Sequence, residues 1–135
     1  MALVGADARR ISVRGASKLV SRSLELARPF LGRVVVVVVD RPLGSRHPRH
    51  GFLYEVNYGY VPGMLAPDGE ALDAYVLGVV EPLSRTEGVV IAIIHRCEDD
   101  DDKRVVVPEG VTLSDADITA AVRFQEQFFS TRIVR

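Results

Sequence analysis

Three acidic residues lie close together in the stretch LAPDGEALDAYVLGV, residues 65–79, just before the chain becomes apolar. They are Asp68, Glu70 and Asp73, at spacings of two and three positions. Carboxylates this close raise one another's pKa and cost free energy unless a cation compensates. Mg²⁺ prefers carboxylate oxygens and keeps several waters, so the stretch is a candidate metal site. The alternative is a solvated acidic turn, because Asp-Gly is common in turns.

A second acidic run, Glu98 to Asp102, comes directly before Lys103. Five adjacent acids usually form a solvated loop. Here apolar segments at 89–94 and 105–107 flank the run, and we expect these two strands to hold its ends. If both acidic segments open at the same end of the fold, they form a pocket for two or more metal ions. Such ions polarise phosphoryl oxygens and lower the pKa of a bridging water.

The stretch RHPRHGFLYEVNYGYVPG, residues 46–63, combines basic and tyrosine side chains. Arg46, His47, Arg49 and His50 suit phosphate oxygens, the arginines in particular because a guanidinium can bind two oxygens at once. Tyrosine hydroxyls can also donate to phosphate. The two histidines lack a spacing typical of zinc ligands. A plain surface loop for the basic residues, and half-buried packing for the tyrosines, are the alternatives.

Composition narrows the class of protein. The chain has 135 residues, a net charge of −1, 47% hydrophobic residues and a single cysteine. One cysteine forms no internal disulfide, so we expect a reducing, cytoplasmic location. No apolar run approaches the ~18 residues of a membrane span, and no membrane partner is expected. Residues 1–33 are basic but have no aromatic residue before Phe30, and the remainder is acidic, so nucleic-acid binding is not favoured.

The pattern of apolar residues predicts a small β domain. We expect residues 1–15 to be a loose leader and residues 16–135 to form one domain. Val34–Val39 is too uniform for a strand with a solvent face, which predicts a central strand. Further predictions are a helix over 17–30, strands over 52–56, 71–79, 88–95 and 104–107, and a last helix that begins with a Ser114/Asp117 capping box. Short strands with turn-rich connections indicate a small barrel or sandwich.

The segment GFLYEVNYGYVPGMLAPDGEALDAYVLGV resembles the central signature of the family I soluble inorganic pyrophosphatases, in which Asn-Tyr-Gly-Tyr precedes spaced acids at the head of a strand. The resemblance extends from Phe30 into FQEQFF, and the wider stretch from Phe30 to Glu109 is similar to a short bacterial branch of pyrophosphatase-like proteins. It implies a mainly β fold with flanking helices, built on a five-stranded OB-like closed barrel. It also implies Mg²⁺-dependent hydrolysis of inorganic pyrophosphate to two phosphates by a metal-bridged water.

The resemblance assigns roles to individual residues. Glu70 and Tyr58 fall on catalytic positions, with Glu70 beside the attacking water. The implied metal ligands are Asp68, Glu70, Asp73, Glu98, Asp101 and Asp102, with the later loop ambiguous by one residue. The implied phosphate-binding residues are Tyr58 and Lys103, together with Arg46, His47, Arg49 and His50, which take the place of a hairpin that this chain lacks.

The chain also departs from the family pattern. Glu70 replaces an aspartate, Ala71 replaces a proline, and Phe128 and Phe129 stand near positions where the family has a tyrosine and a lysine. These changes leave two alternatives open: a protein that acts on another small phosphate ester or anhydride, and a non-catalytic module that binds metal or phosphate. The expected partner is a small molecule such as pyrophosphate. A homo-oligomer remains open, because bacterial members are often hexamers, although this shorter chain lacks segments that could form that interface.

Overall fold

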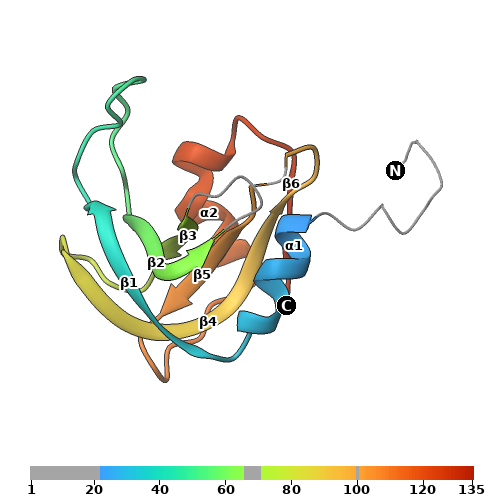
Figure 1. Cartoon of the computed structure of the whole chain (residues 1–135). Helices are drawn as coiled ribbons and strands as arrows, with labels where there is room; N and C mark the ends of the chain where they lie inside the picture. Colours follow the sequence, from blue (N-terminus) through green and yellow to red (C-terminus); the bar gives the residue numbers. More distant parts are fainter. Residues whose placement is uncertain (1–21, 66–70, 100) are drawn as a thin grey trace.

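The computed structural model describes residues 22–65, 71–99 and 101–135. The predicted leader, residues 1–15, and the acids Asp68 and Glu70 lie outside these ranges. The elements in chain order are α1 Arg22–Ala27, the 3₁₀ helix η2 Arg28–Phe30, β1 Val34–Arg41, β2 Asn57–Leu65, β3 Ala71–Val76, β4 Arg85–Arg96, β5 Lys103–Val107, α2 Asp115–Glu126 and β6 Thr131–Val134 (Figure 1). None of the helices in the described ranges is both long and apolar enough to cross a membrane.

Five strands close into a barrel, which confirms the mainly β, OB-like prediction. The strand order is β1-β2-β3-β5-β4, and β1 also pairs with β4, so the sheet closes on itself; β6 extends the sheet beyond β4. The named strands pair antiparallel except for β3 with β5, which run parallel. A parallel pair cannot be joined by a tight hairpin, and here β4 lies between β3 and β5 in the chain.

Alternate residues of the strands fill the barrel interior. On β1, Val35, Val37 and Val39 are buried, whereas Val34 is 60% exposed. The prediction that this valine run has no solvent face is therefore wrong, because every second side chain of a barrel strand points outward. Its central position is confirmed by pairing with both β2 and β4. Buried residues of α1 and η2 join the interior cluster and cover one end of the barrel.

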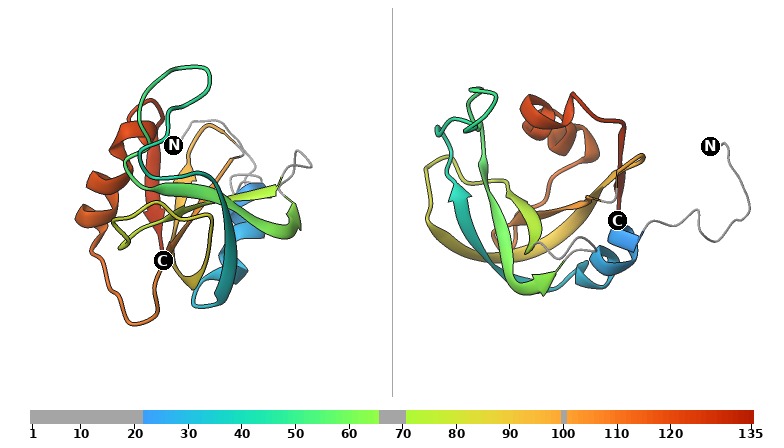
Figure 2. Two further views of the ribbon diagram at one scale, coloured as in Figure 1. Left: turned by 90° about the vertical axis from the view of Figure 1, so that its left-hand side faces the viewer. Right: turned by 45° about the horizontal axis from the view of Figure 1, so that its top comes forward.

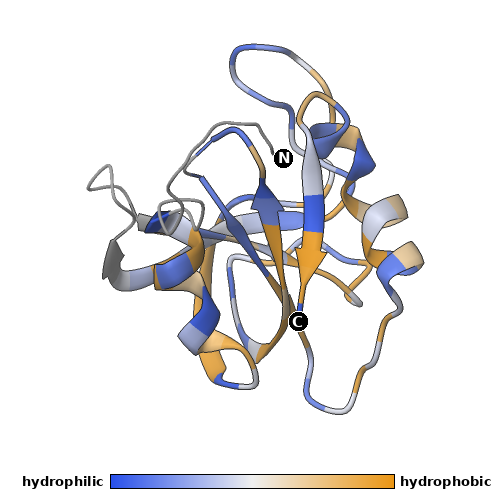
Figure 3. Ribbon diagram, turned by 90° about the vertical axis from the view of Figure 1, so that its right-hand side faces the viewer, coloured by the Kyte–Doolittle hydropathy of each residue, from blue (hydrophilic) through white to orange (hydrophobic). Residues whose placement is uncertain are grey.

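A second apolar cluster lies on the outer face of the barrel, under α2 (Figure 2). Leu72, Ala74 and Val76 of β3 belong to the interior cluster, and Tyr75, between them, belongs to the outer one. Strand alternation thus gives β3 and β5 two apolar faces. Figure 3 shows the apolar parts of the strands beside α2, while the long connection between β1 and β2 is largely hydrophilic.

The start of α2 is as predicted. Ser114 is the N-cap: its hydroxyl accepts the Asp117 amide at 3.1 Å, and the Asp117 carboxylate accepts the Ser114 amide at 3.0 Å. Hydrogen bonding to Ser114 lowers the pKa of Asp117, and the bond from the Ser114 amide has the largest effect. The reciprocal pair satisfies two backbone donors that a helix start otherwise leaves open.

The predicted strand over residues 52–56 is wrong. This segment contains one isolated bridge, Arg46 with Leu53, and β2 begins only at Asn57. The buried Asn57 amide explains the change: its oxygen accepts the Leu43 and Leu83 amides, each at 3.0 Å, and its nitrogen donates to the Glu81 carbonyl at 2.9 Å. Asn57 thus links the β1–β2 connection to the β3–β4 connection by hydrogen bonds, and residues 52–56 form a folded loop.

The strand β6 was not predicted. It has four residues and follows α2 directly, too short for a clear alternation. It pairs antiparallel with the end of β4, with Ile93 opposite Val134. Its formation depends on the exposed edge of β4, which only the assembled sheet provides.

We expect Gly59→Ala to lower the free energy of unfolding by about 3 kcal/mol. A Cβ at this position in β2 would overlap the Val38 carbonyl oxygen and press on the backbone of Val39. Urea denaturation followed by circular dichroism measures the change. Val80→Ala is the control, because Val80 is 93% exposed, and its effect should stay below about 0.5 kcal/mol. Equal midpoints for the two variants would contradict the close approach of β1 and β2.

Candidate functional site

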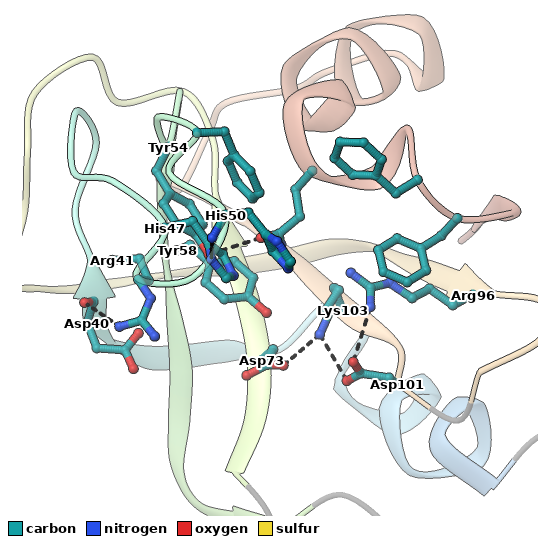
Figure 4. A pocket seen from close by; sticks show the side chains of 14 residues that line it. Asp40, Arg41, His47, His50, Tyr54, Tyr58, Asp73, Arg96, Asp101 and Lys103 are labelled. Carbon is teal, nitrogen blue, oxygen red and sulfur yellow. Dashed lines mark hydrogen bonds and ion pairs between the residues drawn. The ribbon is translucent and has the colours of Figure 1, made fainter.

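One pocket brings together six of the candidate residues: His47, His50, Tyr58, Asp73, Asp101 and Lys103. It has a volume of about 780 Å³ and opens between the barrel, the β1–β2 connection and the end of α2 (Figure 4). It is lined by acidic, basic and aromatic side chains: Asp40, Arg41, His47, His50, Phe52, Tyr54, Tyr58, Asp73, Arg96, Asp101, Lys103, Gln125, Phe128 and Phe129.

The parallel pairing of β3 with β5 brings Asp73 to Lys103. The register places Ala74 opposite Arg104, so the preceding residue on each strand lies at the same edge of the pocket. The Lys103 ammonium lies 2.6 Å from Asp73 Oδ2 and 2.9 Å from Asp101 Oδ1, and its side chain is 3% exposed. Figure 4 shows the three side chains pointing toward one another. One buried cation therefore neutralises two carboxylates from separate acidic segments.

Arg96, the last residue of β4, connects the pocket to α2. Its Nη1 donates to Asp101 Oδ2 at 3.2 Å, while Nε and Nη2 donate to the two Glu126 oxygens at 3.0 and 2.8 Å. Burial opposes the charge on Arg96, but the hydrogen bonds and charge of Glu126 raise its pKa above the usual value. A bidentate, buried pair of this kind holds the guanidinium in one orientation.

A line of hydrogen bonds continues from Glu126 behind the pocket. The Tyr75 hydroxyl donates to Glu126 Oε2 at 2.5 Å and accepts Gln125 Nε2 at 2.6 Å. The Tyr54 hydroxyl donates to Gln125 Oε1 at 2.9 Å. Burial, and then the Glu126 carboxylate, raise the pKa of Tyr75 far above its usual value. The line fixes the end of α2 against β3 and the β1–β2 connection.

Tyr58 lies beside the charged residues of the pocket. Its ring centroid is 5.7 Å from the Lys103 ammonium and 4.9 Å from the Tyr75 ring. Burial, and then the charge of Asp73, raise the pKa of Tyr58 well above its usual value. The hydroxyl is therefore protonated at neutral pH and can donate a hydrogen bond to an anion.

The basic residues of the β1–β2 connection divide into two groups. His47 and His50 line the pocket. The exposed Arg46 instead donates to the Gly51 carbonyl at 2.8 Å, and Arg49 is exposed and does not line the pocket. His47 Nδ1 accepts the amides of Arg49 and His50 at 3.0 and 3.1 Å. Burial, and then electrostatic repulsion from the neighbouring basic side chains, lower the pKa of His47 below its usual value, so its ring is neutral at pH 7.

The residues of the later acidic run also differ in whether they line the pocket. Asp101 lines the pocket, but the Asp102 carboxylate is 1% exposed and lies 3.0 Å from His95 Nδ1. Asp102 also accepts the Arg96 amide at 3.0 Å. The structure therefore turns Asp102 away from the pocket, because successive residues at the start of β5 point to opposite faces. Glu98 is exposed and is not among the lining residues.

Arg104 supports Asp73 from inside the barrel. It is fully buried, its Nη1 donates to the Asp73 carbonyl at 3.0 Å, and its guanidinium lies 4.9 Å from the centroid of the Phe30 ring. Nε and Nη2 have no hydrogen-bond partner in the described part of the chain. Burial lowers the pKa of Arg104 to about 10, so the side chain still carries its charge at neutral pH.

Several site residues escaped the sequence interpretation, namely Arg41, Arg96, Gln125 and Glu126. Arg96 stands between an apolar strand and an acidic run, a position that signals an ion pair. Glu126 has no such signal, because its partner lies 30 positions away. Among the described residues, no group of three or more potential metal ligands gathers at one point. The proposed ligands Asp68 and Glu70 are not among the residues described.

The similar proteins found by sequence and by structure are inorganic pyrophosphatases. No family model matches the chain. An inorganic pyrophosphatase from Aeropyrum pernix is 35% identical over 79 residues, which cover 56% of this chain and 42% of that protein. The match thus spans less than half the length of the relative.

Solved structures of inorganic pyrophosphatases share the fold. The enzyme from Neisseria gonorrhoeae has a TM-score of 0.55 and 24% identity, over 69% of this chain and 72% of that one. The protein from Ehrlichia chaffeensis has a TM-score of 0.61 and 16% identity, over 76% and 85%. The protein from Thermus thermophilus has a TM-score of 0.54 and 19% identity, over 76% and 80%.

We expect Glu126→Gln to lower the free energy of unfolding by about 3 kcal/mol, because the buried Arg96 loses its buried, bidentate anionic partner and keeps only the more exposed Asp101. Chemical denaturation at pH 7 measures the change. Glu109→Gln, at an exposed position, removes the same charge without touching the pocket and should be nearly neutral. A Glu126 variant as stable as the Glu109 variant would show that Arg96 does not depend on this carboxylate.

Proposed function

We propose that this chain, a pyrophosphatase-like protein by its fold and its central sequence, hydrolyses inorganic pyrophosphate to two phosphates in a Mg²⁺-dependent reaction. One observation carries the proposal. Asp73 and Asp101, from two separate acidic segments, direct carboxylate oxygens at one buried cation, the Lys103 ammonium. Converging carboxylates beside a pocket with further basic side chains suit an anionic substrate that arrives with a divalent cation.

A magnesium ion fits the arrangement of these two carboxylates. Mg²⁺ is usually held by one or two carboxylates, with waters and substrate phosphates completing its shell. The Lys103 ammonium stands in for such an ion, because its contacts with Asp73 and Asp101 mark a point where a cation is stable. Asp73 and Asp101 would hold the ion once the ammonium moves aside. When bound, Mg²⁺ polarises phosphoryl oxygens and lowers the pKa of the attacking water.

The proposal includes further metal ligands for which the sequence is the only support. Asp68 and Glu70 are proposed as metal ligands, and Glu70 also as the residue that orients the attacking water. Glu98 is a third proposed ligand, although it is exposed and does not line the pocket. Asp102 is not part of this set, since its buried carboxylate is engaged with His95 and the Arg96 amide.

The chain's own cations bind and orient the phosphates. Arg41, Arg96 and Lys103 line the pocket and offset the charge of the two phosphoryl groups. An arginine fork can bind two phosphate oxygens at once, and Glu126 holds the Arg96 fork in position. The protonated Tyr58 hydroxyl donates to a phosphoryl oxygen. Water adds to one phosphorus, the bridging oxygen leaves with the other, and two phosphates result.

A non-catalytic metal- or phosphate-binding module is the second candidate. The observation that favours it is the pairing of both Asp73 and Asp101 with side-chain cations, Lys103 and Arg96. A pocket whose acids are already neutralised binds an anion readily but activates water poorly. Mg²⁺-dependent phosphate release separates the two candidates.

We expect Asp73→Asn to lower the rate of phosphate release from pyrophosphate about 100-fold, because it removes a carboxylate from the proposed ion site. A colorimetric phosphate assay with Mg²⁺ measures the rate, and chelation of the metal should abolish it. Asp99→Asn is the matched control: it removes an exposed acid of the later run that does not line the pocket, and it should retain the rate. No release by the unmodified protein would overturn the hydrolytic proposal.

We expect Lys103→Met to bind Mg²⁺ about tenfold more tightly in the absence of substrate. The Lys103 ammonium competes with the ion for the two carboxylates, and loss of one hydrogen bond between charged groups corresponds to about this factor. Titration calorimetry measures the affinity. Arg85→Met removes an exposed positive charge outside the pocket and should leave the affinity unchanged. Equal or weaker Mg²⁺ binding by Lys103→Met would contradict a shared position for the ammonium and the metal ion.

A further inference from the structure

The pocket is larger than pyrophosphate requires. Its volume of about 780 Å³ falls in the range of about 300–1,000 Å³ that is typical of sites for drug-sized ligands. Pyrophosphate consists of only two phosphoryl groups that share an oxygen. The pocket therefore has room for more than two phosphoryl groups beside Lys103 and Arg96.

Part of the remaining wall of the pocket is aromatic. His47, His50, Phe52 and Phe128 line the part next to the β1–β2 connection and the end of α2. The His50 and Phe52 rings are nearly parallel, at 6° and a centroid distance of 6.3 Å, and Phe128 lies 6.3 Å from Phe52. In Figure 4, His47 and His50 lie above the group formed by Asp73, Lys103 and Asp101. The pocket thus has a charged part and an aromatic part.

Phe128 is the most exposed of the phenylalanines that line the pocket. Phe124 is buried, and one face of Phe129 is covered by the Arg96 guanidinium at 3.7 Å from its centroid. Phe128 is 67% exposed. Exposure of a large aromatic side chain costs hydrophobic free energy, and a ligand ring stacked on Phe128 would recover part of it.

We propose that the pocket binds a phosphoanhydride that carries a heteroaromatic ring, of the nucleoside di- or triphosphate class. The phosphates lie against Lys103, Arg96 and Arg41, and the ring stacks on Phe128 beside Phe52 and His50. Stacking suits this class because every nucleobase has a π-face, whatever its hydrogen-bonding edge. The inference rests on the proposed function, since it names the substrate class of the same site.

Calorimetry with ATP and with inorganic tripolyphosphate, both with Mg²⁺, tests the proposal. The two probes have the same phosphate chain and differ in the nucleoside. We expect ATP to bind at least about tenfold more tightly, as one stacked base implies. Phe128→Ala should remove most of this preference and should weaken tripolyphosphate binding far less. Val80→Ala, an exposed apolar residue outside the pocket lining, is the matched control and should keep the preference.

The outcomes separate this proposal from the proposed function. Equal affinity for the two probes, no binding of ATP, or an equal loss of both in Phe128→Ala would overturn the nucleotide proposal even if pyrophosphate is hydrolysed. A ring-dependent preference without phosphate release from any substrate would keep the nucleotide proposal and overturn hydrolysis. Light scattering identifies one further case: if Phe128→Ala dissociates an oligomer and no ATP preference exists, Phe128 covers a subunit contact and the proposal fails.

Discussion

The parallel pairing of β3 with β5 is the constraint on which the pocket depends. Because the two strands run in the same direction, the residues at their beginnings meet at one edge of the sheet. Asp73, the third residue of β3, and Lys103, the first residue of β5, lie at this edge, and Asp101 lies two positions before Lys103. An antiparallel pair would place the acids at opposite ends of the barrel, where each would be solvated separately. The topology, rather than the number of acids, therefore creates the site.

The crowded charges at this edge are held by side-chain cations. Lys103 bridges Asp73 and Asp101, and Arg96 bridges Asp101 and Glu126. Desolvation of such buried pairs cancels much of their Coulombic gain, so they are weak evidence for high stability. Their clear effect is geometric, because each side chain has one orientation in which all of its partners are satisfied. This places two positive groups and two acids in fixed positions around the charged part of the pocket.

Strand alternation separates the structural and the functional sides of the barrel. Successive residues of β5 illustrate this: Arg104 points into the barrel and donates to the Asp73 carbonyl, whereas Lys103 points outward to the Asp73 carboxylate. The same strand residue, Asp73, is thus held from both faces. The outer face also carries Tyr75, whose hydroxyl links the barrel to Glu126 of α2. The position of α2 and the shape of the pocket are in this way coupled through hydrogen bonds.

Local sequence signals predicted the mainly β class, the central position of β1 and the capping box of α2, and clustered charge marked Asp73 as a candidate. They left a barrel and a sandwich as alternatives, because alternation and turn residues act over only a few positions. The closed OB-like barrel and the roles of Tyr58 and Lys103 were implied by the family resemblance. Packing of the strands and α2 was needed to show that Asp101, and not Asp102, faces the pocket. The same holds for the loop at residues 52–56 and for the pairing of Arg96 with Glu126. In each case the partner lies on another element, so its distance and direction exist only in the packed fold.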